Sequence, residues 1–435
     1  MSSIQSGRPG KEAAPANAAP QNENALQQFV IVGLFMAFAT AFSWSALRTE
    51  NLNDFLPLWL AAKFFAMGQE SAIYAKDTAY FTMSPPPEWV ALLRASGSEA
   101  SIYPYVYPPL WAKLLAPLTN VFTFAQATQF LTLLNPVLLI GTIYLAWRAA
   151  PKIPLLFHML AGTALILGTT VGLTPIAVGQ MHILVGFLMV LAMERSRNGS
   201  PKAAGVALAI AAAFKLFPLV FVIFFIAKRQ TSALVSFACT GAALGLASLL
   251  LAGWPLHAEF LSQISAVSRT MLFVNPSINI DGIIGHLIGF EDAITIDQGA
   301  RHVVLEKGPV WIWASRILMI GTVAALGIIS WRNQRVADHP LIWATGFLAF
   351  ALVSPLSWTF YYIAPLCMAP YLITSLGIKR AAAFFIYVLI SLSLLMIKIP
   401  VGLFGIYFPL QIYGTFAMIA LLIAYVFTIY RETRA

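Results

Sequence analysis

Long apolar segments separated by short polar ones make up almost the whole chain. Apolar runs of about 18–25 residues recur, and this is the length that an α-helix needs to cross a hydrocarbon core roughly 30 Å thick. A transmembrane β-barrel would instead show alternating segments of about ten residues. The pattern predicts spans at residues 27–47, 126–147, 154–172, 176–193, 232–252, 310–330, 339–356, 359–376, 381–398 and 410–430.

One apolar segment is too short for the crossings that its flanking loops require. Residues 203–227 lie between two basic loops and offer only about 25 apolar residues, too few for two full spans. We therefore expect a re-entrant hairpin or two short broken helices there. Such irregular backbone is tolerated in a membrane where protein surrounds it or it lines a cavity. The whole pattern predicts a polytopic all-α membrane protein with about 10–13 transmembrane helices, some of them short or broken.

The basic residues predict how the chain is oriented. Short loops rich in Lys and Arg, such as 194–202 and 331–335, mark the cytoplasmic side. Counting spans between these loops places two long segments, about 48–107 and 253–309, on the outer side. Both are aromatic-rich and only moderately polar, so we expect interfacial helices and loops. The Pro/Ala/Asn/Gln-rich residues 1–25 are expected to form a disordered cytoplasmic tail, which leaves one membrane domain from residue 26 to residue 435.

Composition excludes a soluble globular protein. Of the 435 residues, 59% are hydrophobic and only 10% are charged, against about 25% charged in soluble domains. The net charge of +9 would suggest nucleic-acid binding in a soluble chain. Here the basic residues lie mostly in loops that orient the protein across the bilayer. We therefore expect a multi-pass protein of the inner (plasma) membrane that contacts the lipid bilayer and no nucleic acid.

Asp54 is the first polar group that needs an explanation. It lies in "NLNDFLPLW", residues 51–59, where the first span should end. One interpretation is an interfacial acid, solvated by headgroups or capping the short helix that follows. The other is a general base: apolar neighbours would raise its pKa, and it could then take a proton from a hydroxyl group.

Three more polar side chains lie in apolar segments. Gln180 and His182 begin the span 176–193, and Lys215 lies in the middle of the short segment 203–227. Intramembrane polar groups indicate function unless they pair with one another. Helix–helix hydrogen bonds are the alternative for the first two. Lys215 could face a phosphate-bearing ligand, or it could pair with a carbonyl or with an acid such as Asp54.

Two aromatic stretches complete the set of candidates. Tyr107 belongs to "YVYPPLW", where the prolines can start a helix and the aromatic rings suit the membrane interface. Trp358, Tyr361 and Tyr362 belong to "VSPLSWTFYYIAP" at an outer turn. They could be interfacial aromatics or could stack on a sugar ring, and spacing alone does not separate these interpretations.

Taken together, these segments resemble glycosyltransferase family 87, a GT-C class family whose members use polyprenol-phosphate-linked sugars, among them mannosyltransferases. The resemblance covers about residues 50–370. It is carried by six stretches in order: "NDFLPLWLAAKFFAMGQESAIY", "YVYPPLWAKLLAPL", "VGQMHILVGFLMVLA", "AAAFKLFPLVFVIFFIAKR", "NPSINIDGIIGHLIG" and "VSPLSWTFYY". Each motif is degenerate alone, and the ordered set is the specific signal.

The resemblance implies a role for several residues. Asp54 would be the general base, and Lys215, in the family's Lys-x-x-Pro motif, would lie near the donor phosphate. Gln180, Asn275 and Ser277 would help to line the site. The chain also departs from the family: His182 stands where Asn is frequent, and Thr359, Phe360 and Tyr361 stand where many members carry Asp and His. A different sugar or acceptor would follow from these departures, so mannose is only the default.

These expectations define an inverting transferase. A polyprenyl-phosphate-linked sugar would bind from the outer leaflet, and Lys215, with Arg269 or His182, would neutralise the leaving phosphate. Asp54 would deprotonate the hydroxyl of a glycolipid or glycan acceptor. No cofactor is expected. A divalent ion could help to neutralise the phosphate, but the sequence has no Asp-x-Asp pair to hold it. The alternatives are a transporter or flippase of a lipid-linked or small amphipathic substrate, and a non-catalytic partner in envelope biogenesis.

Overall fold

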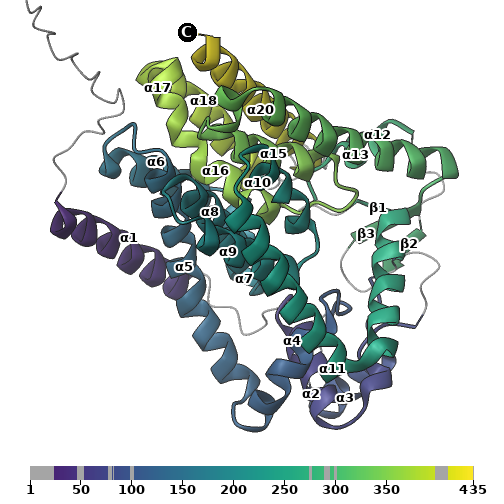
Figure 1. The fold of residues 1–435 in the computed structure, drawn as a ribbon. Helices are drawn as coiled ribbons and strands as arrows, with labels where there is room; N and C mark the ends of the chain where they lie inside the picture. The colour runs from purple at the N-terminus through teal and green to yellow at the C-terminus, as the bar shows by residue number, and fades with distance from the viewer. Residues whose placement is uncertain are drawn as a thin grey trace, which may run out of the picture.

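The computed structural model describes residues 24–46, 53–76, 81, 83–97, 102–273, 277–288, 294–297, 301–396 and 410–434. The predicted tail therefore lies almost wholly outside the described residues. Helices dominate the described part of the chain (Figure 1), which confirms the predicted all-α polytopic class. Within it, six helical segments are long and apolar enough to cross a membrane, or seven if a bent pair is counted as one span.

The long helices occupy most of the predicted spans. They are α1 (Ala25–Ala46), α5 (Phe124–Ala149), α11 (Thr231–Arg269), α13 (Pro309–Arg332) and α20 (Leu410–Arg434). A sixth apolar segment, Thr359–Leu376, combines α16 (Ile363–Met368) and α17 (Leu372–Leu376) with two short 3₁₀ turns. Shorter core helices include α8 (His182–Arg197), α14 (Gln334–Ala337), α15 (Leu341–Val353) and α18 (Ile378–Ser391).

The segment that was too short for two spans is broken, as predicted. It folds as α9 (Pro201–Phe214), a 3₁₀ turn (Phe217–Phe221) and α10 (Val222–Ala227). Lys215 lies at the break, with extended backbone angles of φ −141° and ψ 137°. Pro218 follows within the 3₁₀ turn, where a proline lacks the N–H that a continuing helix needs.

A second break was not predicted. The expected continuous span 154–172 is wrong, because the chain bends by 62° between α6 (Leu155–Leu167) and α7 (Thr170–Val178). Thr169 causes a new helix to start here, since its side-chain oxygen accepts a hydrogen bond from the Val171 N–H at 3.3 Å. Helix α7 then ends at Gly179, whose φ of +68° suits glycine.

The first long outer segment contains the expected short helices. They are α2 (Leu56–Ala66) and α3 (Pro87–Ala95), and α4 (Pro109–Leu115) follows directly. Figure 1 shows them beside the bend of α11, at the end of the molecule opposite to the C-terminus. That bend is at Gly253, whose φ of +74° interrupts the helix.

The second long outer segment contains a small sheet as well as helices. After α11, the strands β1 (Thr270–Phe273), β2 (Ile294–Asp297) and β3 (Arg301–Glu306) form an antiparallel sheet in the order β1-β3-β2. Helix α12 (Ile280–Ile288) lies between β1 and β2 in sequence. The hydrophobic pattern indicated interfacial helices and loops only, because strands of four to six residues give too short a periodic signal.

Glycine allows two of the core helices to approach closely. Helix α9 packs against α8 and against the first half of α11. A Cβ atom at Gly205 would lie 2.2 Å from the Ala233 carbonyl oxygen, so no larger residue fits there. This contact fixes one end of α9, and the other end reaches Lys215.

Candidate functional site

A cavity of about 490 Å³ lies where the broken helices meet the first outer segment. We call it the central cavity. Its wall is mainly aromatic and aliphatic, with a small number of polar side chains, a composition typical of small-molecule sites. The polar and aromatic residues that line it include Asp54, Tyr103, Tyr107, Gln180, Lys215, Ser268, Ser354, Trp358, Phe360 and Tyr361.

Asp54 is held at the cavity by its own backbone and by an amide side chain. It lies in the turn before α2, where the Val178 carbonyl accepts hydrogen bonds from the N–H groups of Asp54 (2.9 Å) and Phe55 (3.3 Å). Asp54 does not cap α2, because Phe55 is the N-cap and no side chain caps that helix. The expectation that Asp54 caps this helix, one form of the interfacial-acid alternative, is therefore wrong.

A hydrogen-bonded chain of three side chains ends at this carboxylate. The Tyr107 hydroxyl donates to Gln180 Oε1 at 2.6 Å, and Gln180 Nε2 donates to Asp54 Oδ2 at 2.7 Å. Tyr107 and Gln180 are buried. The chain fixes the orientation of the Gln180 amide, because its oxygen faces the phenol and its nitrogen faces the acid.

The loop that carries Tyr107 is itself anchored by tyrosines. The Tyr74 hydroxyl donates to the Tyr107 carbonyl at 2.8 Å, and the Tyr105 hydroxyl donates to the Pro108 carbonyl at 2.7 Å. Each bond satisfies a polar atom that is removed from water. The aromatic run before α4 therefore holds the position of Tyr107 through the backbone as well as through its own side chain.

Lys215 lines the same cavity, at the break that ends α9. Trp111 stabilises the break that carries it: the indole N–H donates to the Ala213 carbonyl at 2.6 Å, and the indole ring stacks on Phe214 at 3.5 Å between centroids. This bond satisfies one of the carbonyls left free at the end of α9.

Three aromatic rings surround the Lys215 ammonium. Nζ lies 5.5 Å from the Tyr107 ring centroid, 5.1 Å from that of Phe360 and 5.4 Å from that of Tyr361. These distances permit cation–π attraction, worth about 0.5–2 kcal/mol per ring. Within the described residues the ammonium makes no ion pair, with Asp54 or any other acid. Pairing with Asp54, one alternative for Lys215, is therefore wrong.

The two charged groups still act on each other across the cavity. Asp54 lies outside the membrane-spanning helices, and burial raises its pKa from 3.8 to about 6. The positive charge of Lys215 and the Gln180 hydrogen bond oppose that rise. The site thus holds a carboxylate whose pKa is close to neutrality, as a general base at physiological pH requires.

The structure brings only some of the predicted residues to the cavity. Tyr107, Gln180, Trp358 and Tyr361 line it together with Asp54 and Lys215. The other candidates that the structure describes, His182, Arg269, Ser277 and Tyr362, do not line it. Asn275 lies outside the described residues.

The residues that miss the cavity have other neighbours. The His182 ring lies behind the wall, stacked on Phe217 at 5.5 Å and 4.4 Å from the Tyr361 centroid. Ser277 and Tyr362 tie the outer segment to the turn before α16: Ser277 donates to the Ser357 carbonyl at 3.3 Å and Tyr362 to the Ile278 carbonyl at 2.7 Å.

Two aromatic residues of the cavity, Tyr103 and Phe360, lie beside the charged groups and were missed from sequence. Burial raises the pKa of Tyr103, and the nearby charge of Asp54 raises it further. Tyr103 precedes Tyr107 in the same tyrosine-rich run, a signal that could have found it. Phe360 was noted only as a departure from the family pattern, yet its ring lies against Lys215.

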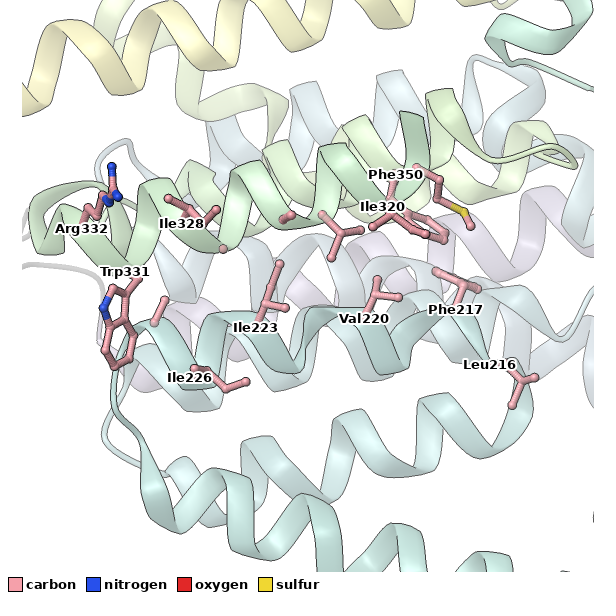
Figure 2. Close-up of a pocket in the computed structure, with 15 residues that line it drawn as sticks. Leu216, Phe217, Val220, Ile223, Ile226, Ile320, Ile328, Trp331, Arg332 and Phe350 are labelled. Carbon is pink, nitrogen blue, oxygen red and sulfur yellow. The ribbon is translucent and has the colours of Figure 1, made fainter. Parts of the chain in front are cut away.

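A long apolar groove leads away from the central cavity. Its volume is about 880 Å³, and we call it the α10–α13 groove. Leu216, Phe217 and Met319 line both the groove and the cavity. Figure 2 shows its side chains facing one another from Leu216 and Phe217 at one end to Trp331 and Arg332 at the other. Helix α13 rises about 20 Å between Met319 and Arg332, at about 1.5 Å per residue.

The described residues contain no group of three or more His, Cys, Asp or Glu side chains that could hold a metal ion. The acids of the cavity region are therefore not arranged as a metal-binding cluster. The absence of a cofactor stays a prediction.

The fold is that of a multi-pass membrane protein. The Asp54 carboxylate and the Lys215 ammonium group both line the central cavity, which adjoins the α10–α13 groove. Glycosyltransferase family 87 is the family to which the chain belongs, since the model of that family matches residues 105–355. A curated relative from Mycobacterium tuberculosis (strain ATCC 25618 / H37Rv) is 25% identical over 282 residues, which cover 60% of each chain. It is named polyprenol-phosphate-mannose-dependent alpha-(1-2)-phosphatidylinositol mannoside mannosyltransferase.

These matches confirm the predicted family and support glycosyl transfer as the activity. The alignment covers less than two thirds of the relative's length.

Proposed function

We propose that the protein is an inverting glycosyltransferase that moves a sugar, by default mannose, from a polyprenyl phosphate to a lipid or polysaccharide acceptor. The observation that carries the proposal is the presence of Asp54 and Lys215 in the lining of one cavity, without a direct ion pair between them. The name of the relative, which states dependence on polyprenol-phosphate-mannose, supports the choice of donor.

The α10–α13 groove also supports a lipid-linked donor. It begins at Leu216, the residue after Lys215, and its wall is apolar as far as Arg332. A donor phosphate beside the Lys215 ammonium would leave the isoprenoid chain at the mouth of this groove. A polyprenyl chain carries no polar atoms, so the apolar wall suits its whole length.

The chemistry follows from the two charged groups. Asp54 takes the proton of the acceptor hydroxyl while the oxygen attacks the anomeric carbon. The bond between that carbon and the phosphate oxygen breaks, and polyprenyl phosphate leaves with the electron pair. Lys215 stabilises the charge that develops on the phosphate. The attack comes from the face opposite to the phosphate, so the configuration inverts. The leaving phosphate needs no general acid, which is why a single carboxylate suffices, unlike the pair used in glycoside hydrolysis.

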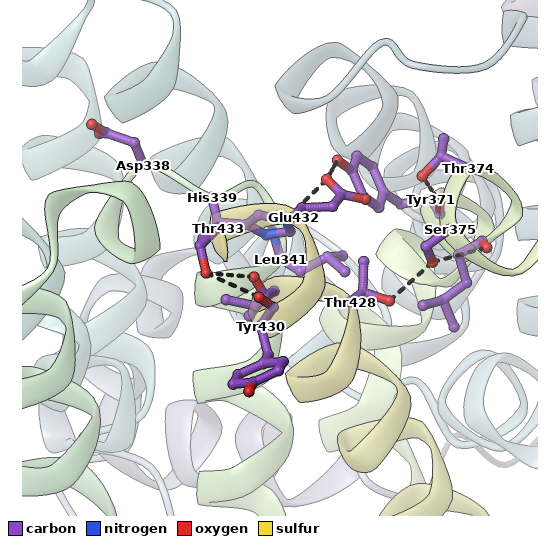
Figure 3. A network of polar contacts seen from close by, with 12 residues as sticks. Asp338, His339, Leu341, Tyr371, Thr374, Ser375, Thr428, Tyr430, Glu432 and Thr433 are labelled. Atoms are coloured by element: carbon purple, nitrogen blue, oxygen red, sulfur yellow. Dashed lines mark hydrogen bonds and ion pairs between the residues drawn. The ribbon is translucent and has the colours of Figure 1, made fainter. Parts of the chain in front are cut away.

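We place this cavity toward the outer face of the inner (plasma) membrane. Glu432 lies in the last turn of α20, at the end of the molecule opposite to α2 and α3 (Figure 1). In the polar network of Figure 3, Glu432 accepts a hydrogen bond from Tyr371 at 2.8 Å and lies 3.2 Å from His339. Arg335 and Arg431 bond to backbone carbonyls in the same region. Basic residues collect on the cytoplasmic side of membrane proteins, which supports this orientation.

Substitution of the proposed base tests the function. Asp54→Asn should lower kcat at least 100-fold, the usual contribution of a positioned general base, and should leave donor binding intact. Glu88→Gln, an exposed acid on α3, is the matched control and should keep wild-type turnover. The measurement is transfer of labelled mannose from polyprenyl phosphate by purified protein in nanodiscs. A wild-type rate in Asp54→Asn would refute the base assignment, and transport without transfer by the wild type would refute the function.

A further inference from the structure

Trp111 joins the first outer segment to the helix break that carries Lys215. Its indole N–H donates to the Ala213 carbonyl, and its ring lies nearly parallel to that of Phe214, with 10° between the planes. Ala213 and Phe214 are the two residues directly before Lys215. The Lys215 N–H donates to the Ala211 carbonyl at 3.1 Å, which closes the last turn of α9. Trp111 therefore holds the chain at the point where it leaves the helix.

The position of the Lys215 ammonium depends on this backbone contact. Within the described residues the ammonium makes no ion pair, and its neighbours include three aromatic rings. A ring attracts a cation over its whole face, so it fixes the cation less precisely than a directional hydrogen bond does. The ammonium therefore follows the backbone at the break when that backbone moves.

The element that holds Lys215 is also tied to Asp54. Asp54 lies in the turn before α2, and α2 packs against α4, the helix that contains Trp111. Tyr107, just before α4, bonds through Gln180 to Asp54, and its ring lies 5.5 Å from Lys215 Nζ. The start of α4 thus contacts both sides of the site, through the side chain of Tyr107 and through the contact of Trp111 with the break.

We propose that Trp111 is a positioning residue for the transfer reaction: it holds the helix break so that the Lys215 ammonium meets the donor phosphate at a fixed separation from Asp54. The inference rests on the proposed function and deepens it, because it explains how two groups that form no ion pair keep their spacing. A tryptophan that only stabilised the fold would leave the action of Lys215 unchanged.

Trp111→Phe tests the hydrogen bond, because phenylalanine keeps a ring beside Phe214 and removes the N–H donor. In the transfer assay described for Asp54→Asn, kcat should fall about tenfold, since a small misplacement of a catalytic group is costly. The pH at which kcat/KM is half-maximal should rise, because the charge of Lys215 lowers the pKa of Asp54 and a displaced charge lowers it less. Phe214→Leu removes the other ring of the stack and serves as a second variant in case one folds poorly.

Trp147→Phe is the matched control. The Trp147 indole N–H donates to the Ile153 carbonyl at 2.8 Å, in a buried position that does not line the cavity. This variant should lose about as much Tm as Trp111→Phe and keep the wild-type kcat and pH midpoint.

A double-mutant cycle with Lys215→Met separates positioning from folding. If Trp111 acts through Lys215, adding Trp111→Phe to Lys215→Met should lower kcat no further, whereas independent effects would multiply. Full multiplication of the two losses, or an unchanged pH midpoint in Trp111→Phe, would overturn the proposal.

Binding of polyprenyl phosphate gives a reading that needs no sugar transfer. Its Kd for the purified full-length protein in nanodiscs should rise about fivefold in Trp111→Phe, the effect of losing one hydrogen bond, and Trp111→Phe should add nothing in the Lys215→Met background. Equal Kd values in Trp111→Phe and the wild type would contradict the proposal. If the wild type transfers no sugar, the proposed function fails, while this binding cycle still decides whether Trp111 positions Lys215 for a phosphate.

Discussion

Asp281 and Lys307 form a buried ion pair in the second outer segment, whereas Asp54 and Lys215 face the central cavity without forming one. Asp281 belongs to α12, and Lys307 precedes α13. The Asp281 carboxylate also accepts a hydrogen bond from Ser315 at 3.3 Å. The Lys307 side chain is fully buried. This pair joins α12 to α13 and leaves neither charge free for a ligand.

The central cavity keeps the same two side-chain types apart. Gln180 provides the hydrogen bond to Asp54, and aromatic rings replace an anion beside Lys215. Removing charges from water without pairing them costs free energy. The unpaired charges therefore lower the stability of the fold. In exchange, Asp54 is free to accept a proton and Lys215 is free to bind a phosphate. Both places contain one Asp and one Lys. They differ in whether the carboxylate and the ammonium group form a direct ion pair, and this difference distinguishes the candidate site from the structural pair.

The largest expected effects come from replacing the lysine of each pair with methionine, because one lysine should affect activity and the other stability. Lys215→Met should lower kcat/KM about 100–1,000-fold, as the loss of one electrostatic stabiliser of a transition state does, with little change in Tm. Lys307→Met should leave Asp281 buried and unpaired, which costs about 3–5 kcal/mol of folding free energy. Transfer assays and thermal denaturation of both variants measure the two effects. An equal loss of Tm in Lys215→Met would show that Lys215 is structural.

The broken helix was predictable from sequence, whereas the contacts around it were not. A break within residues 203–227 was predicted because the two flanking basic loops enclose too few apolar residues for two full membrane spans. The contact between Asp54 and Gln180 joins residues 126 positions apart, and no local pattern encodes that pairing. His182 was expected in the site on polarity alone. It begins α8, and its ring stacks on Phe217 and not into the cavity.

The ionic state of Asp54 gives a prediction of intermediate size. Because the pKa of Asp54 is about 6, the ionised base is present above this pH and is lost below it. The kcat/KM for transfer should therefore fall about tenfold for each pH unit below about 6 and level off above it. Since the charge of Lys215 lowers the pKa of Asp54, the residual activity of Lys215→Met should have its midpoint at higher pH. An unchanged midpoint would show that the two groups do not act on each other.

The smallest expected effect concerns the tyrosine at the start of the hydrogen-bonded chain. Tyr107→Phe removes the bond to Gln180 Oε1, so the amide is less firmly oriented toward Asp54. Loss of one such bond costs about 1 kcal/mol, and kcat/KM should fall about fivefold. Tyr362→Phe is the matched control, because it loses one buried bond of similar length, to the Ile278 carbonyl at 2.7 Å, outside the cavity. Both variants should lose similar stability, but only Tyr107→Phe should lose activity. Equal activity in the two would mean that Gln180 keeps its orientation toward Asp54 without the phenol.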